Sequence, residues 1–269
     1  MTVLFVEPPS SEAEGGIDLA MATVEEYLRS DDVLVVRDTG ASDLPERGKG
    51  DVVVHFHGLW QPRHSWVSFQ CRRRGIPYVV SPHGMLEPWA WQHKKWKKRP
   101  YWYLIERVHL QNAFRVLATS SLEAKNLASF VGEEDIETIP LALTEDVAPE
   151  YERARQTLGW ESEDTVLLYL SRVHPKKGLH LLLEGMASGD TTYENVRIVV
   201  VGDGPDEYVE RVQDFADRNR GRLPPIEWEG GVWGDRKWTY MQGADLFCLP
   251  THSENFGLVV LEACQVGTP

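Results

Sequence analysis

Residues 245–262 read DLFCLPTHSENFGLVVLE, an apolar run followed by a polar loop and a second apolar run. The first run predicts a buried strand over Asp245–Leu249, and the second predicts a helix that begins near Gly257. Glu254 then lies in the loop between them, and Glu262 lies about a turn and a half inside the helix. Because a strand followed directly by a helix is the repeating unit of a parallel sheet, this stretch predicts an open α/β fold.

The two carboxylates can face one crevice beyond the carboxyl ends of the strands, where open α/β sheets bind their ligands. Two acceptors at different depths suit a ligand that is rich in hydroxyl groups. The amides at the helix start suit an anion, and they belong to Asn255, Phe256 and Gly257. This spacing therefore fits a sugar combined with a phosphate. It fits equally an acid that complements the helix dipole and a surface glutamate on an amphipathic helix.

Strands and helices alternate along almost the whole chain. The expected strands are Val3–Val6, Val33–Arg37, Val52–Phe56, Tyr78–Ser81, Arg115–Ala118, Ile136–Ile139, Val166–Leu170, Val196–Val201, Ile226–Trp228 and Asp245–Leu249. The expected helices are Ile17–Arg29, Arg63–Arg74, Tyr101–Gln111, Ser121–Phe130, Gly178–Ala187, Pro205–Arg218, Trp233–Gln242 and Gly257–Val266. This alternation predicts two doubly wound parallel-sheet domains, residues 1–143 and 144–269. The segment Pro140–Pro149 has neither helical nor strand periodicity, and we expect it to be the linker.

The composition bounds the class of protein. The chain has 269 residues, of which 42% are hydrophobic and 26% charged, and this mix is typical of a soluble globular protein with two domains. A net charge of −13 argues against general nucleic-acid binding. With no signal peptide and no apolar stretch of roughly 20 residues, we expect a cytoplasmic protein. The three cysteines, Cys71, Cys248 and Cys264, have neither metal nor redox spacing, so we expect them to be reduced.

A second strand-to-helix junction carries basic side chains. The segment SRVHPKKG, residues 171–178, follows the predicted strand Val166–Leu170 and leads into a helix. The Arg172 guanidinium and the Lys177 ammonium, beside helix amides, suit a diphosphate leaving group, on which charge grows as its bond to a sugar breaks. The alternative is a pair of solvated basic residues in a loop.

Two further signals lie in the N-terminal half. Gly15 and Gly16 follow the first strand and open a helix, so this backbone could approach a phosphate or an acceptor closely, or form a plain turn. His83 stands in the segment SPHG after the strand Tyr78–Ser81. It could bond a sugar hydroxyl or steady a developing charge, and a structural histidine fits equally.

Together these motifs resemble one family. The E-x7-E pattern of Glu254 and Glu262, with SRVHPKKG, GDGP, SPHG and an early EGG loop, is similar to the glycosyltransferases of family 4, the group 1 transferases. The resemblance covers nearly the whole chain and implies a GT-B fold, in which two Rossmann-like domains face each other across a cleft. It implies transfer of a sugar from a nucleotide sugar with retention of anomeric configuration, and no required metal or other cofactor. In agreement, no two aspartates are separated by a single residue, so the D-x-D metal clamp of the other large glycosyltransferase fold is missing.

The resemblance also implies roles for individual residues. Arg172 and Lys177 would hold the donor diphosphate, and Glu262 would bind the ribose hydroxyls. Glu254 would contact the transferred sugar, near the amides of Asn255, Phe256 and Gly257. Because no residue is an obvious covalent nucleophile, front-side attack assisted by the leaving phosphate is our hypothesis for the retaining chemistry.

Four residues receive roles further from the diphosphate. His83 would approach the transferred sugar from the first domain, and Gly16 would lie near phosphate or acceptor. Gly204, in the GDGP turn, and Val232, in the segment Gly231–Trp233, would lie nearer the nucleobase.

The segment Trp89–Tyr103 combines aromatic with basic side chains. Six of the ten tryptophans lie between Trp60 and Trp102, and the segment itself carries five lysines and arginines in an acidic protein. This combination suits peripheral contact with a membrane or an anionic lipid-linked acceptor, and it also suits stacking on sugar rings. A solvated basic helix face whose aromatics pack into the domain is the alternative.

The pattern of the family continues past Pro269 into another strand and further helices, so the resemblance implies that the second domain is incomplete. We expect the activity to serve polysaccharide or glycoconjugate biosynthesis, with a glycan or lipid-linked acceptor. The alternative is a noncatalytic or partner-dependent module that binds a nucleotide sugar.

Overall fold

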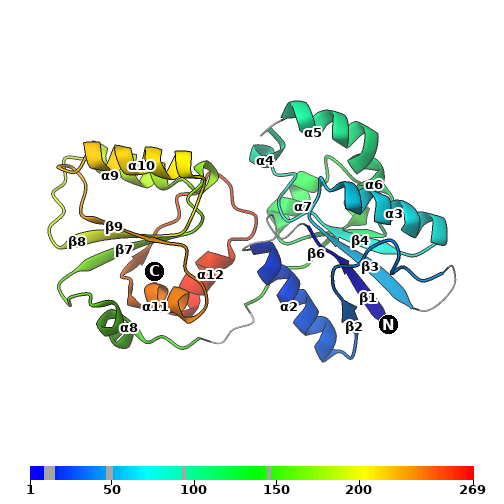
Figure 1. Cartoon of the computed structure of the whole chain (residues 1–269), viewed down its shortest axis with the longest axis horizontal. Helices are drawn as coiled ribbons and strands as arrows, with labels where there is room; N and C mark the ends of the chain where they lie inside the picture. Colours follow the sequence, from blue (N-terminus) through cyan, green and yellow to red (C-terminus); the bar gives the residue numbers. More distant parts are fainter. Residues whose placement is uncertain (9–15, 47–50, 93–94, 144–146) are drawn as a thin grey trace. The chain divides into compact units, whose positions relative to one another are not determined.

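The computed structural model describes residues 1–8, 16–46, 51–92, 95–143 and 147–269. The chain forms two compact units, Met1–Ala142 and Leu143–Pro269 (Figure 1). Of the predicted linker Pro140–Pro149, residues 144–146 lie outside the described residues. Each unit is built on its own parallel sheet, so the predicted pair of Rossmann-like α/β units is confirmed.

The first unit contains a sheet of six parallel strands in the order β2-β1-β3-β4-β5-β6. The strands are β1 Thr2–Val6, β2 Leu34–Val36, β3 Val52–His57, β4 Tyr78–Ser81, β5 Arg115–Ala118 and β6 Ile136–Thr138. Their inner positions are β-branched or aromatic and fully buried, as in Phe5, Val54, Phe56 and Val80. Strands covered on both faces read as continuous apolar runs, which is why the sequence predicts them well.

The helices of the first unit are α2 Gly16–Ser30, α3 Pro62–Arg74, α4 Pro88–Gln92, α5 Lys95–Tyr101, the π-helix η1 Trp102–Glu106, α6 Arg107–Gln111 and α7 Ser121–Leu127, with the 3-10 turn η2 Glu133–Asp135. The predicted helical stretch Tyr101–Gln111 is helical throughout, but it is not one regular α-helix. A π turn precedes α6 there, directly after Pro100 in α5. Proline removes an amide donor from the helical ladder, and π turns are frequent where that ladder is interrupted.

The second unit contains a smaller sheet of four parallel strands in the order β10-β7-β8-β9. The strands are β7 Thr165–Leu170, β8 Val196–Val201, β9 Ile226–Gly230 and β10 Leu246–Phe247. Strand β10 is shorter than the predicted Asp245–Leu249. At its start the Asp245 carboxylate accepts the Val166 amide proton at 2.7 Å. The strand ends at Phe247, and three residues further on Pro250 offers no amide donor that could extend it.

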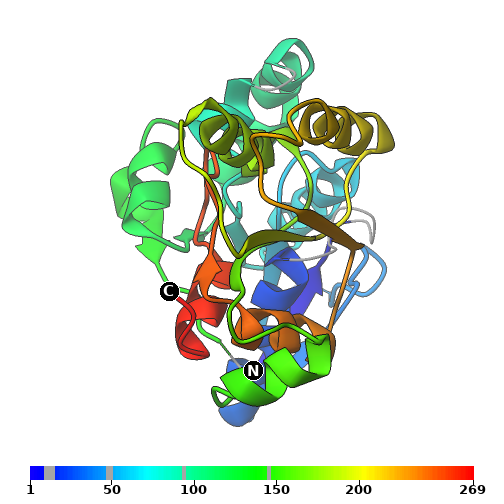
Figure 2. The ribbon, with the colours of Figure 1, turned by 90° about the vertical axis from the view of Figure 1, so that its left-hand side faces the viewer.

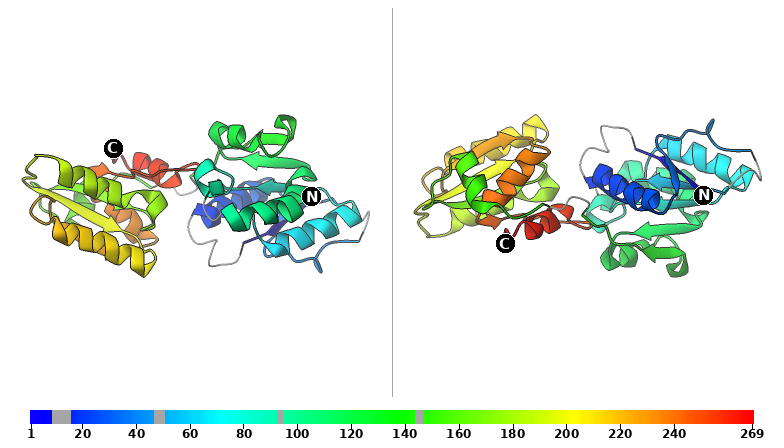
Figure 3. Two further views of the ribbon diagram at one scale, coloured as in Figure 1. Left: turned by 90° about the horizontal axis from the view of Figure 1, so that it is seen from above. Right: turned by 90° about the horizontal axis from the view of Figure 1, so that it is seen from below.

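The helices of the second unit are α8 Tyr151–Leu158, the 3-10 turn η3 Pro175–Lys177, α9 Leu179–Ser188, α10 Asp206–Arg218, α11 Asp235–Gly243 and α12 Leu258–Gln265. The sequence did not predict α8. Figure 2 shows the sheet between α9 and α10 on one face and α8 and α11 on the other. Figure 3 shows each of these helix pairs side by side.

Two apolar cores flank the second sheet because successive strand residues point to opposite faces. Val166 and Leu168 pack with Trp238 and Met241 of α11. Tyr169 packs instead with residues of α9 and α10. No helix among the described residues is long and apolar enough to cross a bilayer.

Candidate functional site

The strand order of the second sheet reverses beside β7. From β7 the chain proceeds through β8 to β9 on one side, and it returns to place β10 on the other side. Such a switch point opens a crevice between the two loops at the carboxyl ends of the strands, where doubly wound sheets bind ligands. The loop after β7 carries Arg172 and Lys177, and the loop after β10 carries Glu254. Three of the residues singled out in the sequence therefore meet at this point.

Lys177 and Glu254 form an ion pair across the switch point. Lys177 Nζ donates to Glu254 Oε2 at 2.6 Å, and the side chains are 13% and 27% exposed, respectively. The carbonyl oxygen of Lys176 accepts from the amide of His252 and from the Thr251 hydroxyl, each at 2.9 Å. The two loops are thus fixed to each other by backbone bonds as well as by charge.

Gly178 allows this close approach of the two loops. Its φ is +73°, a left-handed value that side chains with a Cβ rarely adopt. A Cβ at this position would lie 1.9 Å from the carbonyl oxygen of Pro250. Only glycine therefore lets the loop that carries Lys177 approach the loop that carries Glu254.

Arg172 lies on the same loop and is exposed. Its guanidinium makes no ion pair with any residue that the structure describes, whereas its carbonyl accepts from the Tyr169 hydroxyl at 3.1 Å. The next residue, Val173, is buried and fixes the loop to the core. Arg172 thus presents an exposed cation on the loop that also carries Lys177.

Gly204 and Val232 lie at the carboxyl ends of the neighbouring strands β8 and β9. A Cβ on Gly204 would lie 1.9 Å from the carbonyl oxygen of Val173, so this turn packs tightly on the Arg172 loop. The Gly231 amide donates to Asp203 Oδ1 at 2.8 Å and ties the two turns together. Val232 packs partly buried against the adjacent apolar core.

Glu262 lies on α12, which begins directly after Gly257, with Asn255 and Phe256 in the preceding loop. Its side chain is nearly buried, and Oε1 accepts from Lys237 Nζ of α11 at 2.9 Å. The sequence analysis did not find Lys237. It stands 25 residues before Glu262, and only the packing of α11 beside α12 brings the two together.

His83 follows β4 and has a φ of +50°, which is unusual for a residue with a side chain. Its Nε2 lies 3.1 Å from Nδ1 of His57, and the two rings stack with an interplanar angle of 13°. Burial lowers the pKa of His83 to about 4 and that of His57 well below its ordinary value. Both imidazoles are therefore neutral near pH 7.

His57 was also missed in the sequence. It ends β3, and the order of the first sheet reverses between β1 and β3, so His57 stands at the switch point of that unit. Its position at a strand end, like that of His83, was the available signal. Next to it, His55 Nε2 lies 2.8 Å from the Ser81 hydroxyl, and burial lowers the pKa of His55 to about 3.

The glycine pair is described only in part. Gly15 lies outside the described residues, while Gly16 is the exposed first residue of α2. A Cβ on Gly16 would meet nothing within 4 Å, so its surroundings do not require glycine.

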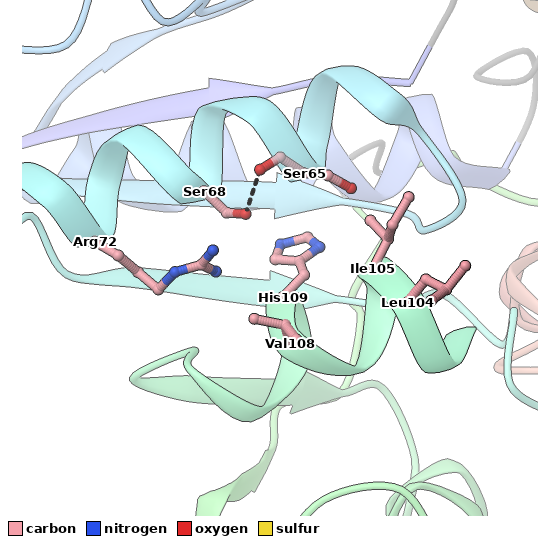
Figure 4. Close-up of a pocket in the computed structure, with 7 residues that line it drawn as sticks. All are labelled: Ser65, Ser68, Arg72, Leu104, Ile105, Val108 and His109. Atoms are coloured by element: carbon pink, nitrogen blue, oxygen red, sulfur yellow. Dashed lines mark hydrogen bonds between the residues drawn. The ribbon is translucent and has the colours of Figure 1, made fainter. Parts of the chain in front are cut away.

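A cavity of about 150 Å³ lies elsewhere in the first unit, between α3 and the helices η1 and α6 (Figure 4). It is lined by Ser65, Ser68, Arg72, Leu104, Ile105, Val108 and His109. None of the residues singled out in the sequence as candidate site residues lines it. In the segment Trp89–Tyr103, Trp102 is buried, whereas Trp96 is strongly exposed, as is Leu104, the next residue after the segment. The aromatics of the segment Trp89–Tyr103 thus divide between core and surface, and residues 93–94 of that segment lie outside the described residues.

The described residues contain no group of three or more histidine, cysteine or acidic side chains placed to hold a metal ion. All three cysteines are free.

Two family profiles match the chain. The profile described as "Glycosyl transferases group 1" matches residues 150–269, and the profile described as "Glycosyl transferase 4-like domain" matches residues 26–142. Each match falls within one of the two compact units.

Curated relatives share part of their length with the chain. A D-inositol 3-phosphate glycosyltransferase of Mycobacterium sp. (strain KMS) is 26% identical over 81% of this chain and 50% of its own length. A phosphatidyl-myo-inositol mannosyltransferase of Mycobacterium leprae is 30% identical over 43% of this chain and 30% of its own. The chain thus spans half of the length of the first of these relatives and less than a third of the length of the second.

Solved structures share the fold. Anabaena HepE, solved in complex with UDP and glucose, superposes with a TM-score of 0.76 at 19% identity, over 100% of this chain and 79% of its own. The sucrose-phosphate synthase of Thermosynechococcus elongatus gives a TM-score of 0.76 at 16% identity, over 100% of this chain and 80% of its own.

Proposed function

We propose that this chain, which belongs to the group 1 glycosyl transferases, transfers a sugar from a nucleoside diphosphate sugar to an acceptor hydroxyl. The observation that carries the proposal is the Lys177–Glu254 ion pair at the switch point of the second sheet, with the exposed Arg172 on the same loop as Lys177. Anabaena HepE, which shares the fold, has been solved with UDP and with UDP-glucose, and this supports a nucleotide sugar as donor.

The chemistry follows from an exchange of partners. When the bond between the anomeric carbon and the diphosphate breaks, negative charge grows on the leaving oxygen, and Arg172 and Lys177 stabilise it. Lys177 leaves Glu254 for the diphosphate already when the donor binds, and the freed carboxylate accepts from hydroxyls of the transferred sugar. Recognition of the diphosphate and recognition of the sugar are thereby coupled through one ion pair.

Retention of configuration is part of the proposal. The acceptor hydroxyl attacks the face that the diphosphate leaves, its oxygen bonds to the anomeric carbon, and its proton passes to the leaving phosphate oxygen. His83 serves as a neutral hydrogen-bonding partner for a sugar hydroxyl, because burial keeps its pKa near 4. Since two cationic side chains supply the positive charge, the reaction requires no metal.

Binding of UDP, GDP and ADP, each compared with its nucleoside, tests the diphosphate site. A nucleotide at 100 times its Kd should stabilise the protein by about 2.7 kcal/mol in thermal or urea unfolding. Lys177→Met should weaken binding of the nucleoside diphosphate about tenfold or more and leave the affinity for the nucleoside nearly unchanged. Arg218→Met, a substitution on the exposed face of α10, is the control.

Turnover is measured next as transfer or slow hydrolysis of the donor that binds, with and without EDTA. Activity that EDTA abolishes would refute the metal-free mechanism. Binding without any turnover would identify a noncatalytic binding module. Equal nucleotide affinity in wild type and Lys177→Met would remove the diphosphate site from this loop.

We further propose that the acceptor is lipid-linked, and that the segment Trp89–Tyr103 binds the surface of the anionic bilayer that carries it. Its helix α5 carries several basic side chains around Trp96, which is 71% exposed. The neighbouring Tyr103 and Leu104 are exposed to a similar degree. Exposed aromatic and apolar side chains among cations are typical of helices that lie in the membrane interface.

Sedimentation with phosphatidylglycerol vesicles tests this surface. Wild type should bind these vesicles and not phosphatidylcholine vesicles. Replacing Trp96 and Leu104 by serine should weaken vesicle binding about tenfold or more, since burial of each side chain in the bilayer contributes about 2 kcal/mol to binding. Trp233→Ser is the matched control, because Trp233 is 73% exposed on the second unit. Equal loss in the control would show that the effect is not local to this segment.

A further inference from the structure

Two imidazoles share one proton at the carboxyl edge of the first sheet. His57 is the last residue of β3, His83 follows β4, and the two strands are parallel neighbours. His57 Nδ1 lies 3.1 Å from His83 Nε2, which is a hydrogen-bonding distance. Both rings are neutral near pH 7, because burial lowers the pKa of each. A hydrogen bond between two neutral imidazoles joins one N–H to one bare nitrogen, so only one of these two atoms carries a proton.

The ring of His57 has no other polar contact in the part of the chain that the structure describes. It is fully buried, and its centroid lies 4.7 Å from that of Phe5 and 3.9 Å from that of His55. Its second nitrogen, Nε2, is buried and makes no hydrogen bond with any described residue. The bond to His83 is therefore what determines the position of the proton on His57.

The unpartnered Nε2 of His57 decides the direction of this bond. If His83 donated from its Nε2, the proton of His57 would stand on Nε2, as a buried N–H group without an acceptor. Buried N–H groups without an acceptor are rarer in proteins than buried acceptors without a donor. The favoured arrangement is therefore the other one, in which Nδ1–H of His57 donates to Nε2 of His83.

This direction fixes the chemistry that His83 can offer. With Nε2 occupied as an acceptor, its own proton stands on Nδ1, which has no hydrogen-bond partner within the described part of the chain. The side chain is partly exposed, so this N–H group is open to a ligand. An N–H group only donates, and His83 can thus bond a sugar oxygen but cannot accept a hydroxyl proton.

The backbone of His83 is held independently of His57. The next residue, Gly84, donates its amide proton to Glu123 Oε1 at 2.7 Å, and Oε2 of the same carboxylate accepts from the amide and the hydroxyl of Thr119. Glu123 is buried, so this anchor is shielded from water. A substitution of His57 should therefore change the proton on His83 without releasing its loop.

We propose that His57 is a positioning residue that fixes the tautomer of His83, so that His83 meets the sugar of the donor only as a hydrogen-bond donor. The consequence for turnover rests on the proposed function, which brings a sugar to His83. The tautomer itself is a property of the free protein. The inference adds a second histidine to the site and states which nitrogen of the first one acts.

The competing view is that His57 only fills space beside His83. Asparagine carries its amide nitrogen on Cγ, as histidine carries Nδ1, so His57→Asn can still donate to His83 Nε2. Leucine has the same branching at Cγ and cannot donate. Both substitutions remove the ring of His57, so a comparison of the two separates the loss of volume from the loss of the donated proton.

NMR reads the tautomer directly, without any ligand. Long-range proton–nitrogen correlation on protein labelled with 15N-histidine shows which nitrogen of each ring is protonated, and His83→Asn identifies the signals of His83. In wild type and in His57→Asn, His83 should carry its proton on Nδ1. In His57→Leu the proton should move wholly or partly to Nε2. His64→Leu is the matched control, because His64 is another buried histidine of this unit and its loss should leave the tautomer of His83 unchanged.

Turnover of the donor measures the consequence. His57→Leu should lower kcat/KM about tenfold, which corresponds to the loss of one hydrogen bond, whereas His57→Asn should stay within about twofold of wild type. The affinity for the nucleoside diphosphate without its sugar should be the same in all three proteins, since His83 meets only the sugar.

A proton on Nε2 of His83 in wild type would overturn the inference. An unchanged tautomer in His57→Leu, or an equal loss of kcat/KM in His57→Asn and His57→Leu, would show that His57 only fills space. A wild type that turns over no donor would overturn the proposed function, while the NMR result would still decide the tautomer. Thermal unfolding of each variant shows whether it is folded.

Discussion

Mild acid should unfold the first unit before the second. His55, His57 and His64 are buried in the first unit, and burial holds their pKa values below the ordinary value. The folded unit therefore keeps these rings neutral at a pH where the unfolded chain protonates them. Stability is fully present above the unfolded pKa of about 6.5 and is lost as the pH falls towards the folded values, about 3 for His55 and about 4 for His64.

The size of the effect follows from proton linkage. Between pH 7 and pH 5, protonation stabilises an unfolded histidine of pKa about 6.5 by about 2 kcal/mol, while a folded histidine of pKa 4 or below gains almost nothing. His55 and His64 together should cost the first unit about 4 kcal/mol, and His57, whose pKa burial also lowers, acts in the same direction. Glu7, whose pKa is raised by burial, acts in the opposite direction and offsets a part. The loss is comparable with the whole stability of a domain, about 5–15 kcal/mol.

Urea unfolding at several pH values, followed by hydrogen exchange with mass spectrometry, measures the stability of each unit separately. His64→Gln should reduce the slope of stability against pH in the first unit by about 1.4 kcal/mol per pH unit. His252→Gln, in the second unit, should leave that slope unchanged. A first unit whose stability is constant between pH 7 and pH 5 would refute the reasoning, because the rings would then be protonated in the folded protein as well.

Three substitutions in the second unit test its packing and its charges. Gly178→Ala should destabilise the unit by about 3 kcal/mol or more in urea unfolding, because the new Cβ would meet the carbonyl oxygen of Pro250 at a left-handed φ. Gly221→Ala is the control, and it should change stability little because open space surrounds Gly221. Similar unfolding midpoints for the two variants would contradict this prediction. Arg155→Met should lower the free energy of unfolding by about 3 kcal/mol, since the buried guanidinium pairs with Asp245 and donates to backbone carbonyls. Arg153 is exposed on the same helix, and Arg153→Met should lower the free energy of unfolding by less than about 0.5 kcal/mol. Glu254→Gln should tighten binding of the nucleoside diphosphate without its sugar, measured by calorimetry, because it frees Lys177 from its partner, and weaker binding would argue against the exchange.

The fold could be predicted from local pattern because its strands are buried on both faces. The runs at Tyr78–Ser81 and Arg115–Ala118 occur at the predicted residues, since continuous β-branched sequence bounded by turn residues has few other interpretations. Helix α8 was missed because it follows directly on the linker, outside the expected alternation. The π turn η1 depends on how Pro100 interrupts the ladder, which no periodicity reveals.

The candidate site could be predicted only as far as strand ends could be located. Glu254, Arg172 and Lys177 each follow a strand, and parallel strands place such residues at one edge. Lys237 lies within a helix, and its pairing with Glu262 depends on the packing of two helices rather than on any spacing in the sequence. His57 ends a strand as His83 does, but only the sheet order shows that the two strands are neighbours. The missing information is tertiary in both cases.

The charges at the ligand edge decide how a donor is recognised. Arg172, Lys177 and Lys237 are cations, and Glu254 and Glu262 are carboxylates, so these five groups carry a net charge of only one in a chain whose formal net charge is −13. Long-range attraction of a diphosphate is therefore weak, and most of the affinity has to come from short-range exchange of partners. The diphosphate replaces Glu254 at Lys177, and the freed carboxylate is compensated only when sugar hydroxyls donate to it. A nucleotide without its sugar leaves that carboxylate uncompensated, and the site accordingly favours the complete donor over the spent nucleotide.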